Sequence, residues 1–276
     1  MQSQEAFKVK ESLDFLLDKT YQESGKYKKY HLAIEPKELK SKHGDYFWET
    51  AEIRIFNLSR RPAFTMLTCL HELAHHIQVV DTGNTDHTEA FYTRYYQLLV
   101  MSIALGWVNQ ADVLEEDDSP DRNKIQKLYG SVEDWTIPDL KIKNQFIITV
   151  KNGFPLKDYL RANDFEWFTL MQAWQKSVDS INEARLLEDI LYKKDRRLGI
   201  NVATNATAIF DIAYYLLVKN GYEQRKELRR LGYSWQAFSI KKCWVKQISS
   251  LDYKKEISKA QEVGLAPQLF VPKSRV

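Results

Sequence analysis

The sequence predicts a mixed α+β fold in two regions. The first is a domain with a small sheet and one prominent helix, and the second is a mixed α/β region built from a duplicated unit. Three observations carry this prediction: an amphipathic helical pattern over residues 62–80, short strand patterns before it, and a stretch of the second half that recurs at a fixed offset. We therefore expect one domain over 1–110, an acidic linker over 111–137 and a duplicated domain over 138–276.

The composition is that of a chain with a packed core. Of its 276 residues, 44% are hydrophobic and 13% are aromatic, which excludes wholesale disorder. The sequence has neither the run of about 20 apolar residues that a membrane span needs nor a secretory signal at its start. Its two cysteines, Cys69 and Cys243, lie far apart and form no disulfide framework. We therefore expect a cytoplasmic protein without a membrane partner.

The first domain is expected to begin with a helix followed by short strands. Residues 5–19 carry apolar side chains at roughly helical spacing. Residues 30–34 and 52–56 have the composition of strands, and the second alternates as EIRIF. Gly44 and Asp45 predict a turn between the two strands, since both residue types are frequent in turns.

Two helices are expected after these strands. The helix over 62–80 has Pro62 in its first turn, where a missing backbone N–H is tolerated. The helix over 88–106 has Glu89 in its first turn, where a negative charge suits the helix dipole. Apolar residues spaced three and four apart predict the buried face of the first of these helices: Leu67, Leu70, Ala74 and Ile77.

The residues that follow change character. The stretch 111–137 contains the acidic run EEDD at 115–118, followed directly by Ser119 and Pro120. Acidic runs and Ser-Pro steps are typical of loops and linkers. We therefore expect a linker, with a short helix around 124–129.

The second half contains an internal repeat. The sequence VKNGFPLKDYLRANDFEW at 150–167 recurs as VKNGYEQRKELRRLGYSW at 218–235, an offset of 68 residues. Such self-similarity predicts two copies of one structural unit, over about 141–195 and 209–265. In each copy we expect a strand before the Asn-Gly turn, a short helix after it, a hairpin carrying two tryptophans, and a second helix. For the apolar run before the second turn, within 200–220, a helix that ends at Asn-Gly is the alternative.

A metal-binding motif lies on the helix predicted over 62–80. His71, Glu72 and His75 form the pattern H-E-x-x-H. Residues four apart lie on one face of a helix, so the two imidazoles are placed to bind one Zn²⁺. Glu72 is angled to take a proton from a water activated by the metal, as the general base of a hydrolase.

A third protein ligand is needed, with the fourth position left open to water. His87 is the predicted third ligand, because the Gly- and Asn-containing stretch before it suits a turn that returns the chain to the metal. Asp86 and Glu89 are alternative ligands, or partners that orient an imidazole. His76 points about 100° away from His75 on the helix and is left out of the ligand set.

These residues resemble the SprT-like family of zinc metallopeptidases. HELAHH followed by HTEAF is similar to that family's HExxH and its later H-G-x-x-F, and EIRIFN before TMLTCLHELAHH has the family's order of strand and helix. The resemblance covers about residues 5–106, and Thr88 stands where the family has glycine. It implies a zincin-type fold, His71, His75 and His87 as zinc ligands, Glu72 as general base, and Phe91 as a buried aromatic.

The charge distribution suggests a second partner. From residue 138 onward, 24 Lys and Arg oppose 15 Asp and Glu, giving +9, whereas residues 1–137 carry −6. The repeats combine these cations with tryptophans and tyrosines, as single-stranded nucleic-acid sites do, although packing of two small cores explains the tryptophans equally well.

We expect a zinc-dependent endopeptidase that acts on a protein or peptide substrate. SprT-like enzymes are associated with cleaving proteins on DNA, so the resemblance extends this expectation to nucleic-acid-associated proteins. One alternative is a nucleic-acid-binding accessory protein with a structural or inactive zinc site. Another is a hydrolase acting on a non-peptide carbonyl.

Overall fold

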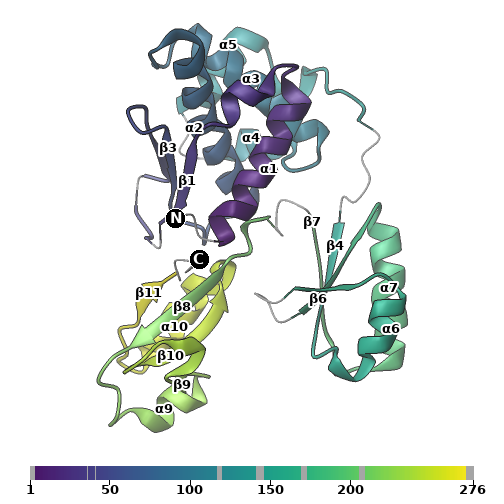
Figure 1. The fold of residues 1–276 in the computed structure, drawn as a ribbon, viewed down its shortest axis with the longest axis vertical. Helices are drawn as coiled ribbons and strands as arrows, with labels where there is room; N and C mark the ends of the chain where they lie inside the picture. Colours follow the sequence, from purple (N-terminus) through teal and green to yellow (C-terminus); the bar gives the residue numbers. More distant parts are fainter. Residues whose placement is uncertain are drawn as a thin grey trace. The chain divides into compact units, whose positions relative to one another are not determined.

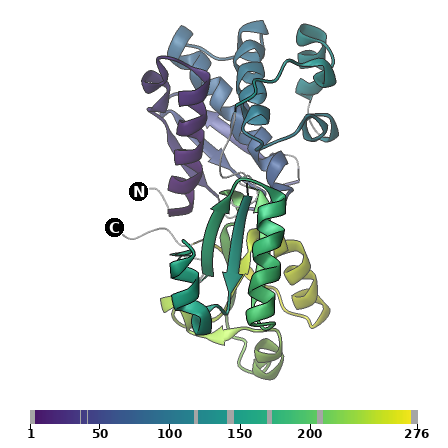
Figure 2. The ribbon, with the colours of Figure 1, turned by 90° about the vertical axis from the view of Figure 1, so that its right-hand side faces the viewer.

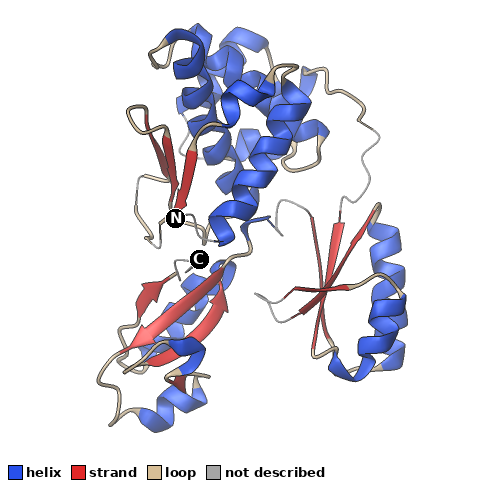
Figure 3. Cartoon of the chain, in the orientation of Figure 1, coloured by secondary structure: helices blue, strands red, loops and turns tan. Residues whose placement is uncertain are grey.

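The computed structural model describes residues 4–35, 37–40, 42–116, 120–140, 146–168, 173–204 and 209–271. The fold is mixed α+β, with small sheets, as the sequence predicts (Figures 1 and 3). The chain divides into two compact units, one formed by 1–86 with 210–276 and the other by 87–209. Neither unit coincides with the ranges 1–110 and 138–276 expected from the sequence. Among the described residues, none of the helices combines the length and apolar character that crossing a membrane requires.

The first unit opens with the elements expected around the HExxH motif. A three-stranded sheet has the order β1-β3-β2, in which β1 is parallel to β3 and β2 is antiparallel to it. The predicted first helix and the strands near 30–34 and 52–56 are confirmed. The elements are α1 (Gln4–Thr20), β1 (His31–Ile34), β2 (Gly44–Phe47), β3 (Glu52–Ile55) and α2 (Pro62–Thr82).

The turn predicted at Gly44 and Asp45 is wrong, because both residues belong to β2. The chain turns later, at 48–51, where Ala51 adopts a left-handed φ of 49°. Asp45 instead pairs across the sheet with Arg54, whose Nε and Nη2 each donate to the carboxylate at 2.7 Å. Glycine and aspartate are both frequent in turns. Here Asp45 pairs with a neighbouring strand and Gly44 allows close packing against α2, and residue type alone does not distinguish these roles from a turn.

Helix α2 packs on this sheet through the predicted apolar stripe. It begins at Pro62 and ends at Thr82, and the next residue, Gly83, caps it with a left-handed φ of 76° and an N–H that donates to the Val79 carbonyl at 2.8 Å. The helix contacts β2 and β3. All four stripe residues are confirmed as core, with at most 1% of their surface exposed: Leu67, Leu70, Ala74 and Ile77.

The rest of the first unit is a four-stranded antiparallel sheet of order β11-β8-β10-β9. Tyr214 in this sheet donates a hydrogen bond of 3.4 Å from its hydroxyl to Glu38 of the N-terminal segment. The elements are β8 (Ala213–Val218), α9 (Arg225–Arg230), β9 (Ser234–Trp235), β10 (Trp244–Ser249), α10 (Tyr253–Glu262) and β11 (Gln268–Phe270).

The second unit begins with helices. The second predicted helix is confirmed as α3 (Glu89–Ala104), and α4 (Gln110–Glu115) and α5 (Pro120–Tyr129) follow it. α5 lies within 111–137 and α4 extends into it from Gln110, where we expected a linker with a short helix near 124–129. This segment is folded because it supplies buried side chains between its charges, including Asp112, Val113, Asp121, Ile125, Val132 and Trp135.

The second unit also contains a four-stranded antiparallel sheet, of order β5-β6-β4-β7. Helices α6 and α7 cover one face of it (Figures 1 and 2), burying Leu160, Ala184 and Leu191 against β4 and β6. The elements are β4 (Phe146–Lys151), α6 (Lys157–Ala162), β5 (Glu166–Phe168), β6 (Ala173–Val178), α7 (Ile181–Lys194) and β7 (Gly199–Thr204).

Each four-stranded sheet contains the predicted hairpin with two tryptophans. Trp167 pairs with Trp174 in one sheet, and Trp235 pairs with Trp244 in the other. The ring centroids lie 5.5 and 5.6 Å apart, in tilted to edge-on contact. In chain order, both sheets follow β-α-β-β-α-β, with the third strand between the first and the second.

In the Asn-Gly pair before each hairpin, the asparagine provides the turn conformation and the glycine allows close packing. Asn152 and Asn220 adopt the left-handed conformation, with φ of 59° and 55°. Gly153 and Gly221 are required by close packing instead, because an added Cβ would lie 2.9 and 3.3 Å from Cδ1 of Trp174 and Trp244, respectively. The equivalent leucine lies against each glycine. The added Cβ would be 2.8 Å from Cδ1 of Leu160 in the first copy and 2.6 Å from Cδ1 of Leu228 in the second.

Candidate metal centre

Helix α2 places His71 and His75 one turn apart, with both side chains partly exposed. Their Nε2 atoms lie 3.1 Å apart, and the rings meet edge-on with centroids separated by 4.8 Å. Two imidazoles of one helix face therefore present adjacent nitrogens to the same point.

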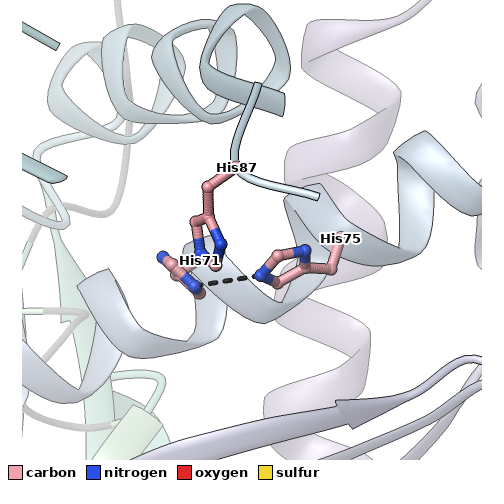
Figure 4. Close-up of side chains that lie close together, drawn as sticks. All are labelled: His71, His75 and His87. Carbon is pink, nitrogen blue, oxygen red and sulfur yellow. Dashed lines mark hydrogen bonds between the residues drawn. The ribbon is translucent and has the colours of Figure 1, made fainter. Parts of the chain in front are cut away.

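His87 joins this pair. The structure brings one ligand nitrogen from each of His71, His75 and His87 to within 4.8 Å of the others (Figure 4). His87 is joined to Asp86 by a peptide bond and directly precedes Thr88, the N-cap of α3. Its ring packs on Phe91 with centroids 4.8 Å apart. Phe91 itself is fully buried, as the sequence resemblance implies.

The donor set fits zinc. Zn–N distances of about 2.0–2.1 Å in a tetrahedral site place neighbouring nitrogens about 3.3 Å apart. The His71–His75 separation of 3.1 Å is close to that value, and the ligand nitrogen of the exposed His87 lies within 4.8 Å of both. Among the described residues, these three histidines form the group of His, Cys, Asp or Glu side chains suited to hold a metal. They leave a fourth position for water or substrate.

Glu72 lies beside this group, on the side of α2 that faces β2. Only 7% of its surface is exposed. A Cβ added to Gly44 of β2 would lie 3.0 Å from Cγ and from Oε1 of Glu72, and 2.7 Å from Cγ2 of Thr68. The absence of a side chain at residue 44 therefore lets the strand backbone approach the carboxylate.

The remaining histidines have other roles. His76 is buried, and its Nε2 and Nδ1 lie 3.0 Å from the Tyr27 carbonyl and the Tyr46 hydroxyl, respectively. Burial lowers the pKa of His76 to about 4, so the ring is a neutral part of the core. His43 lies 2.6 Å from the Asn57 amide through its Nδ1, and His31 is exposed on β1.

The loop before His87 contains a hydrogen-bond network that the sequence did not predict. The His75 Nδ1 lies 2.6 Å from the Thr85 hydroxyl, which donates to the Gln78 side-chain oxygen at 2.8 Å. Asp86, one of the alternative ligands, accepts from the Gln78 amide nitrogen at 2.9 Å. Glu89, the other alternative, begins α3. The available signal was a glutamine about one turn beyond His75 in the predicted helix.

Comparisons of the chain with protein-family models, with curated proteins and with solved structures found no match. The function is therefore inferred from the residues of the site and their chemistry.

Proposed function

We propose that the protein is a zinc-dependent endopeptidase of the zincin type, similar to SprT-like enzymes. The observation that carries the proposal is the convergence of His71, His75 and His87 beside the buried Glu72. A purely structural zinc site closes its fourth position with a protein ligand, whereas three histidines leave that position open. The free state of Cys69 and Cys243 supports a cytoplasmic location as part of the same proposal.

In this proposal, His71, His75 and His87 would hold the zinc ion, which would supply Lewis-acid polarisation of the scissile carbonyl. The Glu72 carboxylate takes the proton of the attacking water and then delivers it to the nitrogen of the leaving amine. Burial of Glu72 between α2 and β2 keeps its side chain in one position, which general base catalysis requires.

Strand β2 favours a peptide over other carbonyl substrates. Within the described part of the chain, β2 lies at the edge of its sheet and pairs only with β3. Its Gly44 backbone approaches Glu72, so the unpaired strand edge and the proposed base are neighbours. An extended peptide added to such an edge gains main-chain hydrogen bonds that do not depend on its side chains.

Removal of the metal tests this activity. The zinc-loaded protein should cleave an unfolded protein such as casein, and treatment with a chelator should abolish cleavage because the carbonyl is no longer polarised. Re-addition of zinc in stoichiometric amount should restore it, as followed by gel electrophoresis and mass spectrometry of the products. Cleavage that persists at full rate in the metal-free protein would contradict the proposal.

We further propose that the two four-stranded sheets are copies of one unit. The equivalence extends beyond strand order to exposure, since Phe154 and Tyr222 are 75% and 73% exposed and Trp167 and Trp235 are 48% and 51% exposed. The inner tryptophans, in contrast, are buried, which accounts for them by packing alone. Packing does not explain the two exposed aromatic rings of each copy, which are Phe154 and Trp167 in the first and Tyr222 and Trp235 in the second.

Single-stranded nucleic acid is the ligand that we propose for the second copy. The guanidinium carbon of Arg225 lies 4.8 Å from the centre of the exposed Tyr222 ring. The same copy carries further exposed cations in α9 and between β9 and β10: Lys226, Arg229, Lys241 and Lys242. Exposed rings next to cations provide stacking and phosphate contacts together. Such a surface is also expected if the protein is a nucleic-acid-binding accessory protein rather than a peptidase.

Substitution of Tyr222 tests this binding surface against a matched position. Tyr222→Ala should weaken binding of a single-stranded oligonucleotide by roughly 5- to 100-fold, the loss expected for one stacked base. Phe154→Ala, in the less basic first copy, is the control and should change affinity little. Fluorescence anisotropy at two salt concentrations measures both. Equal losses for the two variants, or a wild type that does not bind, would contradict this assignment.

A further inference from the structure

The buried side-chain amide of Gln78 in α2 makes hydrogen bonds to the loop between α2 and α3. Gln78 has 4% of its surface exposed. Its Oε1 accepts the backbone N–H of Asp86 at 3.1 Å, and its Nε2 donates to the Asp86 carboxylate at 2.9 Å. The side chain of Gln78 therefore makes two hydrogen bonds to Asp86, the residue directly before His87.

These contacts determine the direction of every hydrogen bond in the network. A backbone N–H only donates, so the end of the Gln78 amide that accepts from the Asp86 N–H must be its oxygen. The Thr85 hydroxyl, 2.8 Å from that oxygen, must donate its single proton to it. Toward His75 Nδ1, 2.6 Å away, the Thr85 oxygen is consequently an acceptor.

These hydrogen bonds determine the tautomer of His75. Its Nδ1 carries the proton, so its Nε2 retains the lone pair with which an imidazole binds a metal. This Nε2 is the atom that lies 3.1 Å from Nε2 of His71. The network thus selects the tautomer of one proposed ligand while it fixes the residue preceding another.

We propose that Gln78 and Thr85 are positioning residues that organise the metal centre before the metal binds. This inference rests on the proposed zinc site. Gln78 acts on His87 through the loop, and Thr85 acts on His75 through its tautomer. A site whose ligands are already ordered and correctly protonated loses less conformational freedom on binding, which raises its affinity.

A pair of substitutions at Thr85 separates the hydroxyl from the shape of the side chain. Thr85→Val has nearly the same volume but no acceptor for His75, and zinc affinity should fall by about 10- to 100-fold, as for other partners that orient ligand histidines. Thr85→Ser keeps the hydroxyl and should bind zinc like the wild type. Competition with a chromogenic chelator measures both affinities in the full chain.

The tautomer of His75 provides a readout that needs neither metal nor substrate. Nitrogen-15 NMR of the metal-free wild type and of Thr85→Ser should show His75 protonated at Nδ1. Thr85→Val should lose this signature and give a mixture. A protein in which Thr85 merely stabilises the loop would keep the same tautomer in all three forms, and that result would overturn the inference.

Gln78 is tested by its coupling to Thr85. Gln78→Leu should weaken zinc binding by a similar factor, and the double variant with Thr85→Val should lose little beyond the larger single effect, because both act through one network. Fully additive losses, or a Thr85→Val protein that binds zinc as tightly as wild type, would overturn the proposal. A wild type that binds zinc but cleaves no peptide would instead contradict the endopeptidase function.

Discussion

Glu72→Gln should retain zinc and lose peptide hydrolysis by about 10²- to 10⁴-fold, the range that a positioned general base contributes. Glutamine has the shape of glutamate, so it fits the narrow space between α2 and Gly44, where Glu72 approaches to within 3.0 Å of the position of an added Cβ. It cannot accept the proton of the attacking water. The rate should be measured with a fluorogenic peptide and the zinc content by mass spectrometry of the same sample.

The zinc content distinguishes the outcomes for this variant. Loss of hydrolysis with full zinc assigns the base role to Glu72. Unchanged hydrolysis would remove that role, and loss of zinc would show that Glu72 acts on the metal site itself.

His87→Ala should weaken zinc binding on the order of 100-fold or more, since about 10–16 kcal/mol of zinc affinity is shared among four ligands in structural zinc fingers, or roughly 3–4 kcal/mol for each ligand. Removal of this imidazole leaves His71 and His75, whose Nε2 atoms lie 3.1 Å apart on one helix, and two ligands hold zinc poorly. Hydrolysis should fall in parallel at limiting zinc.

His31→Ala is the matched control for this substitution. His31 is exposed on β1 and belongs to no group suited to hold a metal among the described residues. Its removal should leave zinc affinity unchanged. An equal loss from both variants would show that zinc binds to surface histidines in general.

Periodic features of the sequence predicted most of the elements around the site. The apolar stripe through Leu67 and Ala74 gave the orientation of α2, and residues four apart on that helix necessarily share a face. His87 was predicted from its distance in the chain and from the residues in the loop, and the structure brings it to His71 and His75.

Features that depend on contacts between distant residues were not predictable in the same way. Glycine is frequent in turns, but Gly44 lies in β2, where Thr68 and Glu72 occupy the space that a side chain would need. The helices of 111–137 form because side chains such as Ile125 and Trp135 are buried by tertiary packing. Gln78 and Thr85 were missed since a network of side-chain hydrogen bonds leaves no period in the sequence.

The zinc-to-protein ratio of the purified wild type, loaded with zinc and passed through a desalting column, tests the central claim most directly. His71, His75 and His87 predict a ratio close to one that falls sharply in His87→Ala measured beside it. A wild type that remains metal-free after loading would contradict the metal centre and the peptidase activity proposed for it.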